Sequence, residues 1–230
     1  MNLLLAKMFE NVKFDKAFNV TYIFKSVVSK WYLYVALALV IVGVVILACK
    51  IKPPKRHNLS STQRIAYLSI FCAICVVVNI LQIPTPLMQL SFVATVCAVG
   101  GILLGATDGF IIGFVGDLIA GIIAPMGVYS PIIGIGTGFL GLVPGLIFSY
   151  VGGKDFIKVI ISFAITFVVT SLILNTIGLS IIYPKYYVLL DRFALLPFTL
   201  LFHAINCLLT IGIIKLLKRT LPKNKFSIDK

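Results

Sequence analysis

Four polar side chains lie inside or beside long apolar stretches of this sequence, where they are costly unless they have partners. They are Asp117, Asn175, Thr176 and Arg192. A carboxylate near the middle of a membrane span costs about 2.5–3.5 kcal/mol on insertion scales, so it normally faces a partner or a wet cavity. A carboxylate or amide offers paired hydrogen bonds to a flat heterocycle, and arginine offers a planar fork to a carboxylate. These residue types predict a binding cavity for a small polar molecule.

An alternative for Asp117 and Arg192 is an ion pair that only joins helices, and the sequence leaves both interpretations open. Tyr129 follows the same stretch as Asp117 and is expected to stack on or cap a bound molecule. Gln89 follows a Pro-Thr-Pro turn at a level where it would line the mouth of the cavity.

The sequence contains no pattern that indicates catalysis or a metal site. There is no GxxxxGK[ST], HExxH or GxSxG and no cluster of His and carboxylates at metal-ligand spacing. Gly136, Gly138 and Gly141 satisfy GxGxxG, but no strand precedes them and no acid follows about 20 residues on. An intramembrane enzyme would have to use His203 with distant acids. We therefore expect no enzyme activity, no cofactor and no metal.

The elements that position these residues must be membrane helices. Of 230 residues, 60% are hydrophobic and 12% charged, against about a quarter charged in soluble domains. The net charge of +13 lies in loops and tails, which favours anionic lipid headgroups over nucleic acid. Apolar runs predict seven spans, near 31–49, 63–82, 89–106, 109–124, 131–151, 156–182 and 194–218.

A basic linker divides the chain into an N-terminal extension, residues 1–58, and a six-helix core, residues 59–220. The extension contains the hydrophobic helix near 31–49, and a basic tail occupies 221–230. Basic residues lie at alternate ends of the core spans, so both ends of the core are expected in the cytoplasm. In this topology Asp117, Asn175, Thr176 and Arg192 converge at one depth near the exterior.

Glycines at 101, 105, 109 and 113 predict two tightly packed helices joined by a very short turn. The glycine-rich run from Gly134 to Gly141 is interpreted as helix packing as well.

The residues resemble a known family. They are similar to the folate family of substrate-binding (S) components of energy-coupling factor (ECF) vitamin transporters. The similarity lies in the stretches LILNTIGLSIIY (172–183) and LLDR (189–192) and in the glycine-rich segment 100–134, which contains a Gly-x-x-x-Gly-x-x-x-Asp pattern ending at Asp117. The resemblance covers about residues 60–220.

The resemblance implies an all-α, six-helix membrane subunit of an ECF-type ABC importer in the bacterial plasma membrane, with one extra N-terminal helix. Such a subunit captures a vitamin, here most simply folate, with high affinity from outside. It then docks on a transmembrane coupling subunit driven by two ATPase subunits. The family's Ala-x-x-x-Ala docking face matches Ser69 and Ala73, with Ala66 one turn earlier.

Two alternatives remain: an S component for another vitamin, and a self-sufficient secondary transporter. The second class often shows inverted repeats, and residues 60–130 and 131–218 show no such correspondence.

Overall fold

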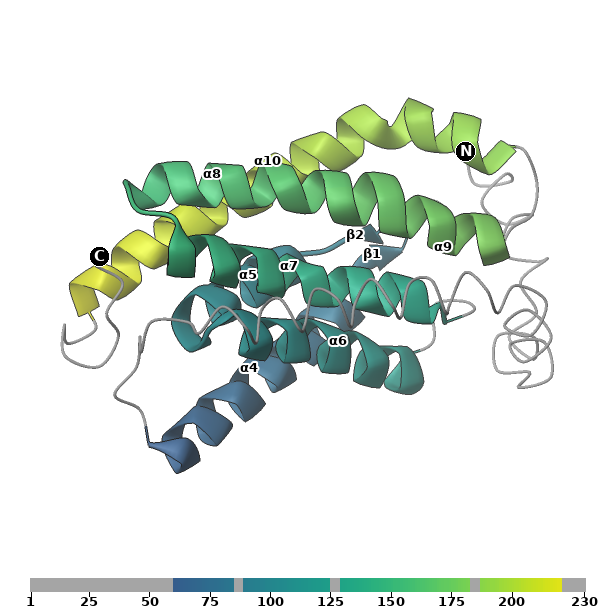
Figure 1. The fold of residues 1–230 in the computed structure, drawn as a ribbon. Helices are drawn as coiled ribbons and strands as arrows, with labels where there is room; N and C mark the ends of the chain where they lie inside the picture. Colours follow the sequence, from purple (N-terminus) through teal and green to yellow (C-terminus); the bar gives the residue numbers. More distant parts are fainter. Residues whose placement is uncertain (1–59, 85–88, 125–128, 183–186, 221–230) are drawn as a thin grey trace.

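The structure is a computed structural model that describes residues 60–84, 89–124, 129–182 and 187–220. The predicted helix at 31–49, with the rest of segment 1–58 and the tail 221–230, lies outside these residues. The described part is helical except for one small hairpin, and its helices pack side by side (Figure 1).

The elements follow the predicted spans closely. They are α4 (Ser61–Ile80), β1 (Ile83–Pro84), β2 (Gln89–Leu90), α5 (Val93–Leu104), α6 (Ala106–Ile123), α7 (Pro131–Tyr150), α8 (Asp155–Thr166), the π-helix η2 (Phe167–Leu174), α9 (Asn175–Ile182) and α10 (Tyr187–Thr220). Five stretches in this part are long and apolar enough to cross a bilayer: α4, α6, α7, the α8–η2–α9 helix over Asp155–Gly178, and α10 over Leu195–Thr220. An all-α membrane fold is therefore confirmed.

The span predicted at 89–106 is shorter than expected. Residues 83–84 and 89–90 pair as antiparallel strands, Ile83 with Leu90 and Pro84 with Gln89, so the helix begins only at Val93. At 1.5 Å per residue, its 12 residues extend about 18 Å, less than the roughly 30 Å of a bilayer's hydrocarbon core.

The last helix begins earlier than the predicted 194. It runs from Tyr187, so Arg192 lies within a helix rather than at its start. No glycine or proline interrupts the chain between Tyr187 and Pro197, and nothing in this stretch breaks a helix.

Glycine contacts hold α5, α6 and α7 together. Gly105, with φ of 115°, is the single residue between α5 and α6, which confirms the predicted short turn. A Cβ on Gly109 would lie 2.6 Å from the carbonyl oxygen of Gly141, and one on Gly141 would overlap the carbonyl of Gly109. The backbones of α6 and α7 are thus in direct contact, and the run from Gly134 to Gly141 serves packing, as predicted.

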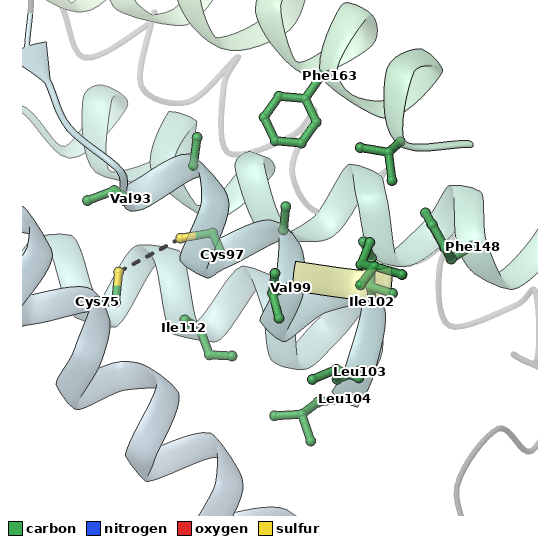
Figure 2. Close-up of a cluster of buried hydrophobic side chains, with 14 residues drawn as sticks. Cys75, Val93, Cys97, Val99, Ile102, Leu103, Leu104, Ile112, Phe148 and Phe163 are labelled. Atoms are coloured by element: carbon green, nitrogen blue, oxygen red, sulfur yellow. Dashed lines mark hydrogen bonds between the residues drawn. The ribbon is translucent and has the colours of Figure 1, made fainter. Parts of the chain in front are cut away.

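The largest buried cluster lies where α4 and α5 meet the rest of the bundle (Figure 2). Cys75 on α4 and Cys97 on α5 are fully buried there, with their sulfur atoms 3.8 Å apart. Phe148 and Phe163 extend the same cluster toward α7 and α8. Four more side chains of α4 pack against the cluster without being fully buried: Leu68, Phe71, Cys72 and Val78.

Candidate functional site

Two ion pairs show which helix ends lie together. Arg64 at the start of α4 binds Asp108 at the start of α6, and Lys218 near the end of α10 binds Asp155 at the start of α8. Six of the seven Lys and Arg residues in the described part lie toward this end: Arg64, Lys154, Lys158, Lys215, Lys218 and Arg219. We call it the basic end.

The polar residues predicted to bind a ligand lie toward the opposite end. Asp117 is in the second half of α6, Tyr129 directly precedes α7, and Asn175 begins α9. Because α6 and α7 run antiparallel in close contact, the end of α6 and the start of α7 are neighbours. These positions therefore lie toward one end of the bundle, and their convergence on a shared binding cavity stays a prediction.

Asp117 contacts two neighbouring helices. Asn79, near the end of α4 and 5% exposed, donates from Nδ2 to Asp117 Oδ1 over 2.9 Å. The hydroxyl of Thr137 on α7 lies beside the same carboxylate, although it donates to the carbonyl of Ile133 in its own helix. A carboxylate in an apolar span needs a donor such as Asn79. Thr137 was not predicted from the sequence because a threonine in a glycine-rich helix is an ordinary packing residue.

Tyr129 and Ser130 lie beside this carboxylate. A Cβ on Gly134 would overlap the hydroxyl of Tyr129 and lie 3.2 Å from Asp117 Oδ2, so both oxygens face the same surface of α7. The hydroxyls of Tyr129 and Ser130 are buried and have no hydrogen-bond partner among the described residues. Burial, and secondarily the Asp117 carboxylate, raise the pKa of the Tyr129 hydroxyl, which keeps it neutral and able to donate.

Asn175 approaches the same helix from the other side. It follows directly on the π-helix η2, whose wider turn changes the direction in which the next residues point. Its Oδ1 lies 3.6 Å from the position of a Cβ on Gly136, and Ser130 Oγ lies 3.4 Å from that of a Cβ on Gly178. Both distances are ordinary van der Waals contacts, so these polar groups lie against the backbones of α7 and α9.

The other predicted binding residues are less well defined. Thr176 is half-buried next to Asn175 on α9, and Gln89 lies in β2. Arg192 lies in the first part of α10, and its side chain is outside the described part, as is that of Gln89. The Asp117–Arg192 ion pair thus stays untested, and the contacts described for Asp117 lead to Asn79 and Thr137.

His203 and Asn206 on α10 form contacts between helices. Asn206 accepts a hydrogen bond from Thr95 on α5 over 2.7 Å, and His203 lies 3.1 Å from the carbonyl of Phe163 on α8. Both residues therefore pack α10 against its neighbours.

The residues predicted for docking lie on an open face of α4. Ala66, Ser69 and Ala73 are exposed, and the Ser69 hydroxyl bonds to the carbonyl of Ile65 within the same helix. Their small side chains leave the helix backbone accessible to another helix.

A shallow apolar hollow of about 390 Å³ lies on α10, away from these sites. It is lined by Ile205, Leu208, Leu209, Gly212, Ile213 and Leu216. None of the predicted binding residues contributes to it.

Comparison with known proteins decides the family. Residues 59–219 match the family described as "ECF-type riboflavin transporter, S component". The chain belongs to the S components of ECF-type transporters. An S component is a transport subunit and not an enzyme, as predicted, and the assignment favours this class over a self-sufficient secondary transporter.

Solved structures share the fold of this S component. The crystal structure of FolT bound with folic acid is 22% identical, with a TM-score of 0.57, and the match covers 65% of this chain and 93% of that one. A structure described as the S component of a bacterial ECF transporter is 19% identical, also with a TM-score of 0.57, over 70% of this chain and 98% of that one. No curated protein matches the chain.

Proposed function

We propose that this S component binds a flat heterocyclic vitamin at the end of the bundle opposite the basic end, and that the vitamin is riboflavin. The observation that carries the proposal is the family match over residues 59–219, because that family is described as a riboflavin transporter component. The sequence pattern alone favoured folate, whereas the family match favours riboflavin.

The polar groups around the start of α7 suit a flavin. The ring of riboflavin has an edge on which an N–H donor lies between two carbonyl acceptors, and the Asn175 amide can both donate to and accept from such an edge. The ribityl chain carries several hydroxyls that Asp117 and Ser130 can bind. The buried Tyr129 and Ser130 hydroxyls lack partners in the described part, as expected of groups that bond to a ligand.

Folate is the alternative ligand, and a different feature favours it. A carboxylate such as Asp117 pairs with the adjacent donors of a pterin, and Arg192 would bind the carboxylates of its glutamate tail. Riboflavin carries no net charge and does not require the arginine. The two vitamins therefore make different use of Arg192.

Titration of the purified subunit in detergent tests the choice directly. Flavin fluorescence is quenched when the ring is buried, and native mass spectrometry identifies any small molecule that copurifies. Saturable quenching by the wild type, weakened in D117N, supports riboflavin. Binding of folate without riboflavin supports the alternative, and binding of neither refutes both.

The partners follow from the family. We propose that the exposed face of α4 with Ala66, Ser69 and Ala73 docks on a transmembrane coupling subunit, which two ATPase subunits drive. The distribution of lysine and arginine supports a cytoplasmic location for the basic end. Copurification of the complex tests this association.

A further inference from the structure

Of the five described stretches that are long enough to span a bilayer, helix α4 is the least buried. Of its 20 residues, only Cys75 and Asn79 are buried. Large apolar side chains such as Ile65, Ile70 and Val77 are at least half exposed, at 63%, 54% and 55%. Each specific contact of α4 therefore has a large share in fixing its position.

Asn79 on α4 forms a hydrogen bond to one carboxylate oxygen of Asp117 on α6. Its amide donates to Oδ1 over 2.9 Å. The second oxygen, Oδ2, lies on the side of Gly134, where the hydroxyl of Tyr129 also lies. One oxygen of the carboxylate is thus bound to a neighbouring helix. The other lies on the same side of α7 as the buried hydroxyl of Tyr129, which has no hydrogen-bond partner among the described residues.

We propose that Asn79 is a positioning residue for ligand binding: it fixes the rotamer of Asp117 so that Oδ2 is presented to the vitamin. This inference rests on the proposed function. Because an oriented acceptor loses less freedom when the ligand arrives, the hydrogen bond of Asn79 contributes to affinity without touching the vitamin. It also makes α4, the helix with the docking face, a structural part of the binding site.

A double-mutant cycle on vitamin affinity tests this role. N79L removes the donor at similar volume, and D117N removes the charge. We expect N79L to weaken riboflavin binding by about tenfold or more, since bonds to charged groups are among the stronger ones. If Asn79 acts only through Asp117, N79L/D117N binds no more weakly than D117N alone. V77A, on the exposed part of the same helix, is the control and keeps wild-type affinity.

The exchanged pair N79D/D117N separates positioning from stability. It rebuilds a carboxylate–amide hydrogen bond between α4 and α6 but places the charge on α4. We expect its melting temperature to exceed that of N79L while binding stays as weak as in D117N.

Additive effects in the cycle, or full recovery of binding in the exchanged pair, would overturn the role of Asn79. If the exchanged pair does not fold, the cycle alone decides. A wild type that binds neither riboflavin nor folate would refute the proposed function itself, and the role of Asn79 with it.

Discussion

Arg64 at the start of α4 and Asp108 at the start of α6 form a two-pronged ion pair, with Nε and Nη2 each 2.6 Å from a carboxylate oxygen. The partners differ in environment, since 53% of the Arg64 side chain is exposed but only 4% of the Asp108 side chain. At the opposite end of α4, Asn79 bonds to Asp117 of the same helix α6. Polar contacts thus fix α4 to α6 at both ends.

Removing Arg64 should destabilise the protein more than removing Asp108, although both substitutions break the same ion pair. R64Q leaves a buried carboxylate without its cation, so we expect it to lower the free energy of unfolding by about 1–3 kcal/mol. D108N leaves an arginine that water solvates, and it should cost less. Unfolding in detergent measures both, with R219Q at the exposed end of α10 as the control. A larger loss in D108N than in R64Q would contradict this account.

Two helical glycines offer a matched test of packing. A Cβ on Gly141 overlaps the carbonyl of Gly109, whereas a Cβ on Gly212 has nothing within 4 Å. We expect G141A to destabilise the fold by about 1–3 kcal/mol, because backbone cannot yield as a side chain does. G212A should be neutral or slightly stabilising, since alanine favours helix over glycine. Thermal unfolding of both variants checks the contrast, and equal effects would refute it.

The Tyr129 hydroxyl should ionise only above the usual range of tyrosine. Its pKa is raised mainly by burial, so the native state retains a proton that the unfolded chain loses near pH 10. The fold therefore loses stability only as the pH rises above about 10. Absorbance at 295 nm, recorded for wild type minus Y129F, should show no tyrosinate from Tyr129 at pH 10. Ionisation with an ordinary pKa would show that the hydroxyl is exposed.

Enlarging the small residues of α4 should block docking without weakening capture. A73L is expected to abolish copurification with the coupling subunit while vitamin affinity stays within about twofold of wild type. The control is A164L, because Ala164 is an exposed alanine on α8. Retained docking in A73L would place the docking surface elsewhere.

Arg192 should distinguish the two candidate vitamins. We expect R192A to leave riboflavin affinity nearly unchanged, because the ligand has no carboxylate. For folate, loss of a charge-assisted pair should weaken binding by about tenfold or more. Parallel titrations of the two ligands measure this. A strong loss of riboflavin binding in R192A would show that the arginine contacts the flavin.

Much of the fold was predictable because a bilayer constrains helices strongly. Apolar length located α4, α6, α7 and the helix over 155–182 to within a few residues, and the glycine spacing indicated the contact of α5 with α6. The hairpin before α5 was missed because its pairing depends on strands of only two residues each. Such short elements leave almost no pattern in a sequence.

The position of the site along the bundle could be predicted from the sequence, but the hydrogen-bond partners of its residues could not. Asp117 could be identified because it is a lone carboxylate in an apolar span, and burying a charge is costly in any fold. Its bond to Asn79 and its position beside Thr137 depend on how three helices are rotated about their axes, and hydropathy does not encode this rotation. The same holds for Ser130, whose buried hydroxyl becomes notable only once its surroundings are known.

The glycine contacts among α5, α6 and α7 also constrain how a bound molecule could leave on the other side of the membrane. Where main chains touch, no side-chain rotamers are available to open a passage between the helices. This part of the molecule is therefore expected to move as one solid piece. Delivery of the cargo would then require the whole piece to turn or tilt in the bilayer.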